Sequence, residues 1–156
     1  MKSCLTYSKS STYDEYMTIP VSENVIFQLP DNVQEAFTFG DCWHLAQTIN
    51  RLSGYPVVTV QWEEPHRSLW CHAANRLPDG RIVDIEGIWE EEEWLWKWQV
   101  HNELHVELDV LVMFAQEWTP ESWAQEVTEC NFDFYYPEIS ENVEQYAKQV
   151  LALSAS

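Results

Sequence analysis

Apolar residues recur at helical spacing in the segment from about Asp41 to Ser53. The positions on the apolar face are Cys42, Leu45, Ala46, Ile49 and Leu52. Asp41 is a residue type that caps helix N-termini, and Gly54 stands where a glycine usually ends a helix. We therefore predict an amphipathic helix that begins next to Cys42.

The spacing of apolar residues changes to that of strands after this helix. Residues 56–62 are rich in β-branched side chains and predict a strand, and the polar residues 63–68 predict a loop. Residues 69–77 and 81–85 flank the turn sequence Pro78-Asp79-Gly80, which predicts an antiparallel hairpin.

The register of this hairpin follows from a three-residue turn. Leu77 then faces Arg81, and the numbers of facing residues add up to 158. His72, Asp84 and Glu86 would share one face of the sheet, because side chains alternate along a strand. Asp84 and Glu86 both remain within reach of His72.

The remaining segments predict elements of both kinds. Residues 1–38 are polar and turn-rich, with a turn at 30–32. Residues 89–100 fit either a short helix or a strand, since the tryptophans at 94, 96 and 98 suit both. Residues 105–112 predict a strand that enters the core, and Thr119-Pro120 begins a helix to about Cys130. Ser140 is expected to cap a last amphipathic helix that runs through Val143 to Leu151.

Length, charge and cysteine content narrow the class of protein. The 156 residues suffice for one domain, residues 1–156, with its own core. A formal charge of -18 argues against direct binding to nucleic acid or to an anionic membrane, which would repel the chain. The first residues lack an apolar signal segment, so we expect a cytoplasmic protein, whose four cysteines remain thiols.

Cys42, His72 and Asp84 are the candidate catalytic residues. The start of a helix favours the thiolate form of a cysteine, and the thiolate is the nucleophile. A histidine acts as acid and base beside it, and a carboxylate orients the histidine. The amide of Cys42 would supply part of an oxyanion hole, with Gln34 as a candidate second donor.

A zinc site made of Cys42, His44, Cys71 and His72 is the alternative chemistry. Adjacent strand residues point to opposite faces, so Cys71 should face away from His72 and the four ligands should not converge. His44 is expected on the helix surface. We therefore expect neither a metal nor an organic cofactor.

The three segments Gly40-Asp41-Cys42-Trp43-His44-Leu45-Ala46, His72-Ala73 and Pro78-Asp79-Gly80-Arg81-Ile82-Val83-Asp84 resemble the core of transglutaminase-like proteins, within the wider papain-like group. The resemblance covers about residues 39–88. It implies that Cys42 is the nucleophile, His72 the acid and base, and Asp84 the orienting carboxylate. It also implies an α+β fold with a papain-like or transglutaminase-like core. In that fold the helix carrying Cys42 packs on an antiparallel sheet. The two helices that the sequence pattern predicts after residue 119 would add to this core at its C-terminal end.

Two functions are consistent with these features. The first is a cysteine hydrolase or acyltransferase, such as a thiol protease, deamidase or transglutaminase-like enzyme, which attacks an amide or thioester of a protein or peptide substrate. The second is a catalytically silent acidic protein that occupies a basic, even nucleic-acid-binding, site of a protein partner. The ordered Cys, His and Asp favour the enzyme, whereas the charge favours the binding protein.

Overall fold

The protein has an α+β fold built on one antiparallel sheet. The computed structural model describes residues 24–64, 67–105 and 113–155. Over these residues, six strands form the sheet in the following order: β1 (Val25–Ile26), β5 (Gly87–Trp89), β4 (Ile82–Val83), β3 (Arg67–Arg76), β2 (Val57–Glu64) and β6 (Met113–Trp118). Every neighbouring pair is antiparallel. The predicted α+β class and antiparallel sheet are confirmed.

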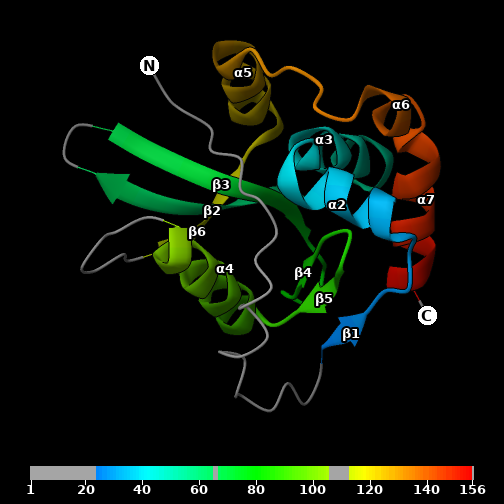
Figure 1. Ribbon diagram of the computed structural model, residues 1–156, viewed down its shortest axis with the longest axis horizontal. Helices are drawn as coiled ribbons and strands as arrows, with labels where there is room; N and C mark the ends of the chain where they lie inside the picture. Colours follow the sequence, from blue (N-terminus) through cyan, green and yellow to red (C-terminus); the bar gives the residue numbers. More distant parts are fainter. Residues whose placement is uncertain (1–23, 65–66, 106–112, 156) are drawn as a thin grey trace.

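Helices cover both faces of this sheet (Figure 1). They are α2 (Asp31–Phe39), α3 (Cys42–Ser53), α4 (Glu91–His105), α5 (Pro120–Cys130), α6 (Pro137–Ser140) and α7 (Val143–Ser154). α3 packs against β3 and α7, whereas α4 supplies Trp94 and Trp98 to a different apolar cluster. The helix that carries Cys42 therefore packs on the sheet, as predicted.

The hairpin of β3 and β4 has the predicted register. Asn75 faces Val83 and Arg76 faces Ile82, so both pairs add up to 158. Gly80 has a φ of +95°, a conformation that glycine adopts without a steric penalty. The pairing stops at Val83, because the backbone turns at Asp84, whose amide donates to the Gly87 carbonyl. Glu86 consequently does not lie opposite His72.

The predicted end of α3 and the predicted bounds of α5 are also confirmed. α3 ends before Gly54, which has a φ of +79° and donates its amide to Asn50. α5 begins after Thr119 and has proline at its first position. In each case residues next to one another in the sequence determine where the helix begins or ends.

Several predicted boundaries were wrong. The turn at 30–32 is the start of α2, since Pro30 precedes a segment that buries Val33, Ala36 and Phe37. The loop at 63–68 is mostly strand, because β2 continues to Glu64 and β3 starts at Arg67. Cross-strand pairing there outweighs the polar sequence.

The two alternatives for residues 89–100 are resolved in favour of a helix. Trp94 and Trp98 lie one turn apart on α4 and are both buried, whereas Trp96 is only partly buried. The predicted strand at 105–112 falls on the end of α4 at His105 and on residues 106–112, which lie outside the described residues. The strand that is described there, β6, begins at Met113.

A β-bulge interrupts the pairing of β2 with β3. Val60 faces His72 and Gln61 faces Trp70, so Cys71 has no residue opposite it. Cys71 packs in the cluster that contains Trp94 and Trp98, and the His72 ring contacts these same tryptophans. The expectation that Cys71 faces away from His72 was wrong, because the bulge breaks the strand alternation at this point.

No helix in the described ranges is both long enough and apolar enough to cross a membrane.

Candidate active site

Cys42, His72 and Asp84 meet between the start of α3 and the sheet. Cys42 is the first residue of α3, His72 lies on β3, and Asp84 directly follows β4. Their exposed fractions are 6, 0 and 3 %, so all three are buried. His72 Nε2 lies 3.1 Å from Asp84 Oδ2. The predicted hairpin register placed Asp84 within reach of His72, and the fold adds Cys42, 30 positions earlier in the chain, whose interaction helps to raise the pKa of His72.

Asp84 accepts hydrogen bonds at both carboxylate oxygens. Oδ1 accepts from the amides of Glu86 and Gly87 at 2.9 and 3.2 Å, and from Trp89 Nε1 at 3.2 Å. Oδ2 accepts from Trp94 Nε1 at 3.3 Å in addition to its contact with His72. Burial alone would raise the pKa of Asp84. The His72 hydrogen bond and the Lys97 charge outweigh burial, and the pKa lies well below its usual range. Asp84 is therefore a fixed carboxylate.

The ring of His72 is held from three sides. It stacks on Trp98 with 4.4 Å between ring centroids, and it lies 6.1 Å from Trp94. Asp84 takes Nε2, and the buried Nδ1 makes no hydrogen bond to the described residues, so Nδ1 is the ring nitrogen left for Cys42. Burial lowers the pKa of His72. Interactions with Asp84 and Cys42 outweigh this and raise it from 6.5 to about 9.

Glu86, the other candidate carboxylate, belongs to a neighbouring ion pair. Its Oε2 lies 2.6 Å from Lys97 Nζ, and Thr38 donates to its Oε1 at 3.1 Å. Lys97 also lies 4.4 Å from the ring centroid of Trp89, the residue whose indole donates to Asp84. Of the two carboxylates that the sequence left open, Asp84 is the one that contacts His72.

The residue before Cys42 is bonded to the far end of the chain. Asp41 is fully buried, and its carboxylate accepts hydrogen bonds from the Tyr135 and Tyr136 amides at 2.9 and 3.0 Å. Ser140 Oγ donates to the same carboxylate at 2.5 Å. Asp41 stands at the predicted N-cap position of α3, but its side chain makes no cap hydrogen bond. The predicted cap of the last helix was also wrong, since Ser140 ends α6 and Asn142 precedes α7.

Gly40 allows the segment after α5 to lie against the start of α3. A methyl group built on Gly40 would be 2.9 Å from Tyr135 Cβ and 3.0 Å from the Tyr136 ring. Real Cβ atoms essentially never approach another atom below 3.0 Å. A larger residue at this position would therefore displace the segment that Asp41 holds.

The two proposed oxyanion donors differ in the structure. The amide of Cys42 lies in the first turn of α3, where amides have no partner inside the helix. Gln34 instead donates its side-chain amide to the Leu29 carbonyl at 2.9 Å and to the Phe27 carbonyl at 3.4 Å. Gln34 holds the segment before α2, and its prediction as the second donor was wrong.

The described residues contain no group of three or more histidine, cysteine or acidic side chains that could hold a metal ion. His44 is half-buried, and its ring stacks on Trp43 with 5.1 Å between centroids. Burial lowers the pKa of His44, and the charge of Asp41 offsets only part of this effect. His44 therefore packs in an aromatic group and does not face His72 as a shared ligand.

Sequence reasoning missed the residues that α4 contributes to the site. Trp94 donates to Asp84, Trp98 stacks on His72, and Lys97 lowers the pKa of Asp84. Their spacing of three and four positions places them on one helical face. This signal was present in the sequence, but it becomes informative only once the segment is known to be a helix.

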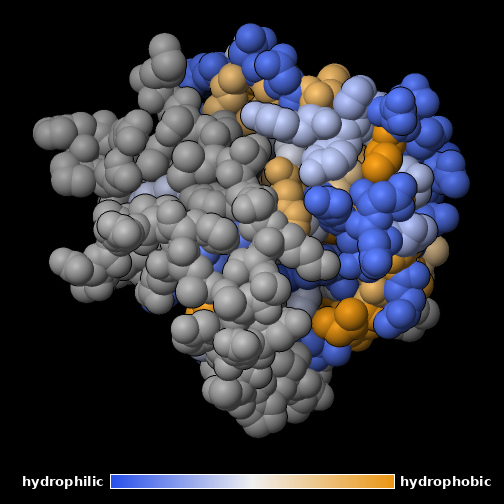
Figure 2. Space-filling model, in the orientation of Figure 1, coloured by the Kyte–Doolittle hydropathy of each residue, from blue (hydrophilic) through white to orange (hydrophobic). Residues whose placement is uncertain are grey.

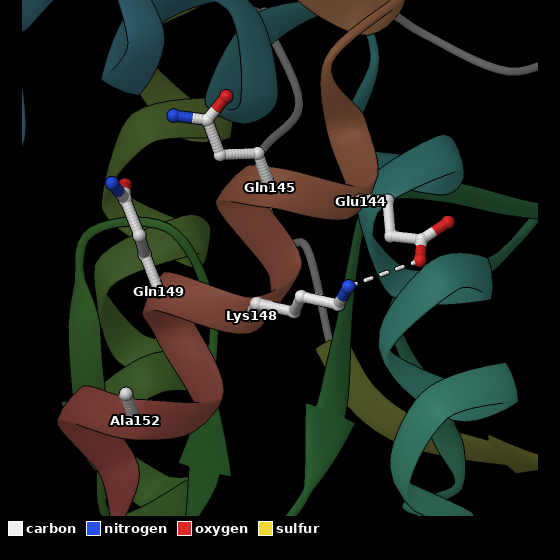
Figure 3. A pocket seen from close by; sticks show the side chains of 5 residues that line it. All are labelled: Glu144, Gln145, Lys148, Gln149 and Ala152. Atoms are coloured by element: carbon white, nitrogen blue, oxygen red, sulfur yellow. Dashed lines mark ion pairs between the residues drawn. The ribbon is translucent and has the colours of Figure 1, made fainter.

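A shallow surface pocket lies elsewhere, on α7. Its lining residues are Glu144, Gln145, Lys148, Gln149 and Ala152 (Figure 3). All five are exposed, and Glu144 pairs with Lys148 at 3.3 Å. None of the three candidate catalytic residues lines this pocket.

Comparisons with known proteins identify no relative of this chain. No protein-family model matches it, and neither the curated proteins nor the solved structures contain a match.

Proposed function

We propose that this protein is a cysteine hydrolase or acyltransferase that acts on an amide or thioester through a covalent acyl-enzyme. Cys42 is the nucleophile, His72 the acid and base, and Asp84 the orienting carboxylate. The observation that carries the proposal is how the two nitrogens of the His72 ring are placed. Nε2 is fixed by Asp84 at 3.1 Å, which leaves Nδ1 for Cys42.

In the first step the Cys42 thiolate attacks the carbonyl carbon of the substrate, and the carbonyl oxygen becomes an oxyanion. The amide of Cys42 donates a hydrogen bond to this oxygen. The intermediate then collapses: the carbon–nitrogen or carbon–sulfur bond breaks, and the His72 imidazolium gives its proton to the leaving group. An acyl-enzyme and a neutral His72 remain.

In the second step a water molecule, or an amine in a transfer reaction, attacks the acyl carbon. His72 takes the proton from this nucleophile and becomes an imidazolium again. The bond from carbon to Cys42 breaks, and the thiolate is restored. Asp84 remains ionised throughout, because burial of its carboxylate is offset by His72 and Lys97.

The papain-like arrangement of the core is part of this proposal. Three features of the element order support it: α3 begins with the nucleophile, β3 carries the histidine after the intervening β2, and the carboxylate directly follows β4. A cytoplasmic location also remains a prediction, and a reducing compartment would keep the Cys42 thiol available.

The first experiment measures the rate of alkylation of Cys42 by iodoacetamide against pH, with peptide mass spectrometry as the readout. We expect the reaction of Cys42 to persist well below the pH at which an ordinary thiol loses reactivity. His72→Ala should remove this low-pH reactivity. An unreactive Cys42, or a normal profile that His72→Ala leaves unchanged, would contradict the proposal.

The chain contains its own reference thiols for this experiment. Cys130 is partly exposed on α5, and Cys71 is buried beside the tryptophans of α4. The Cys130 profile should be the same in the parent protein and in His72→Ala, and Cys71 should react slowly because it is buried. Retained secondary structure of His72→Ala, measured by circular dichroism, separates a lost ion pair from a lost fold.

A second candidate function is that of an acidic binding protein. In the described part of the chain, five cationic side chains are each paired with a carboxylate: Arg51, Arg76, Arg81, Lys97 and Lys148. The 26 acidic residues outnumber the eight basic ones, so a net charge of -18 remains after such pairing. The face in Figure 2 is largely hydrophilic over α6 and α7. Binding of this kind should weaken steeply with added salt, whereas the alkylation profile should depend mainly on pH.

A further inference from the structure

Exposed aromatic side chains gather at one place in the described residues. Phe134 and Tyr135 are 48 and 59 % exposed, and they are the exposed aromatic residues of the described ranges. Both belong to residues 131–136, which join α5 to α6 and which we name the aromatic linker. In Figure 1 this connection passes close to α3. Adjacent exposed aromatic residues are an uncommon feature that indicates a binding surface.

The aromatic linker lies beside the candidate nucleophile. Its Phe134 ring lies 5.3 Å from the Trp43 ring and 5.0 Å from the His44 ring, between centroids. Its Phe132 ring stacks on Trp43 at 5.0 Å. Trp43 follows Cys42 in the sequence and packs with it in one apolar cluster, to which Phe132 adds its ring. A ligand on the exposed rings would therefore lie close to Cys42.

The surroundings of the aromatic linker are acidic. The sequence has no lysine or arginine between Lys97 and Lys148, and every formal charge in that interval is negative. Asp133 lies within the linker, and Glu138 lies just after it. Both side chains are exposed. Such a surface repels anionic ligands and attracts cationic ones.

We propose that the aromatic linker, with Asp133 and Glu138, binds a basic peptide segment of the substrate next to Cys42. A lysine or arginine side chain of the peptide lies over the exposed rings, and the two carboxylates pair with its charges. This inference rests on the proposed function, because it assigns the substrate class of the same site. Asp133 and Glu138 flank the exposed rings on both sides in the sequence, and these carboxylates favour a cationic peptide over a neutral apolar one.

The test measures binding with the Cys42→Ser variant, so that no peptide is consumed. A fluorescent peptide that contains four arginines is compared with the same peptide carrying glutamine in their place, by fluorescence anisotropy. We expect the arginine peptide to bind at least tenfold more tightly, and this difference to shrink as salt is raised from 50 to 500 mM. Equal binding of the two peptides would overturn the inference.

Two variants locate the binding site. Tyr135→Ala keeps the backbone amide that donates a hydrogen bond to Asp41, and it removes only an exposed ring. Asp133→Asn with Glu138→Gln keeps the rings and removes two charges. Each should weaken binding of the arginine peptide at least fivefold. A change smaller than twofold in both would overturn the assignment to the linker.

The matched control removes two exposed charges at a distance from the linker, through Glu90→Gln with Glu92→Gln at the start of α4. This variant should change the affinity less than twofold. An equal loss here would mean that total charge, not the aromatic linker, attracts the peptide. Failure of this inference is also distinct from failure of the enzyme proposal. Reactive Cys42 without peptide binding refutes only the former, and peptide binding with an unreactive Cys42 refutes only the latter.

Discussion

The helices α3 and α5 begin differently, although each follows a residue type that caps helices. Before α5, Thr119 Oγ1 accepts a hydrogen bond from the Ser122 amide at 3.1 Å, and Ser122 Oγ accepts one from the Thr119 amide at 3.0 Å. Before α3, the carboxylate of Asp41 accepts instead from Tyr135, Tyr136 and Ser140. One helix start is thus stabilised by residues within three positions, and the other by residues more than ninety positions away.

The difference shows how a reactive group can be placed at a helix start. A local cap uses the first amides of α5, and nothing else is needed there. At α3 no side chain caps the first turn, so the amides next to Cys42 are not used by a cap. The stability that a local cap would give comes from distant hydrogen bonds. These same bonds hold the aromatic linker against Trp43.

The largest expected effect is at Asp84, whose carboxylate contacts His72 and accepts from two backbone amides and two indoles. Asp84→Ala leaves His72 buried beside Cys42 without its carboxylate. We expect the free energy of unfolding to fall by about 4 kcal/mol, since removing one member of a buried pair leaves the other uncompensated. Urea denaturation measures this loss. The exposed Glu92→Ala serves as control and should change stability by less than about 0.5 kcal/mol.

Asp41→Ala tests the distant anchor of α3 itself. It removes the acceptor for two backbone amides and the Ser140 hydroxyl, and we expect a loss of about 3 kcal/mol in urea denaturation. The quantum yield of tryptophan fluorescence should also change, because the linker packs on Trp43. Unchanged stability would mean that α3 does not depend on these bonds.

The pH dependence of stability follows from the raised pKa of His72. A pKa of about 9 in the folded state, against 6.5 ordinarily, gives stability that is fully present below pH 6.5. It is lost as the pH rises through 9, and the loss should approach about 3 kcal/mol in denaturation curves measured at pH 6 and pH 10. His72→Gln should flatten this difference. If the profile of His72→Gln matches that of the parent protein, the imidazolium does not contribute.

Lys97→Met tests the ion pair beside Asp84. It removes the partner of Glu86 and the cation over Trp89 while keeping an apolar chain of similar length. We expect a loss of about 2 kcal/mol on urea denaturation. The low-pH limb of the Cys42 alkylation profile should also move, because Lys97 helps to keep Asp84 ionised. Lys97→Arg should recover most of the stability and of the original alkylation profile. If Lys97→Met leaves the alkylation profile unchanged, Lys97 contributes to stability alone and not to the state of Cys42.

The smallest expected effect is that of Thr119→Ala, which tests the other helix start of the comparison. It removes a local cap, so the free energy of unfolding should fall by about 1 kcal/mol, and the Cys42 alkylation profile should stay unchanged. A loss equal to that of Asp41→Ala would remove the distinction between the two helix starts.

The sequence predicted those parts of the fold that short-range rules determine. Gly54 ended α3, Thr119-Pro120 began α5, and the Pro78-Asp79-Gly80 turn set the register that brings Asp84 to His72. The choice of Asp84 over Glu86 required the turn after Val83, which the sequence pattern did not reveal.

The errors occurred where distant residues decide the structure. Asp41 and Ser140 looked like two separate caps, yet they bond to each other. The bulge at Cys71 is a property of strand pairing and leaves no pattern in a single strand. The helix at 91–105 depends on packing of Trp94 and Trp98 under the sheet, since the tryptophan spacing alone suited both structures.

The bonds between Asp41 and the segment at 135–140 also set an order of events during synthesis. The ribosome adds Asp41 and Cys42 early and adds Ser140 almost a hundred residues later. Until then, the three donors that bond to the Asp41 carboxylate are missing, and so is the segment that covers Gly40. The start of α3 therefore reaches its final form only after Ser140 has been translated. A growing chain would carry the thiol of Cys42 without the setting in which we propose that it reacts.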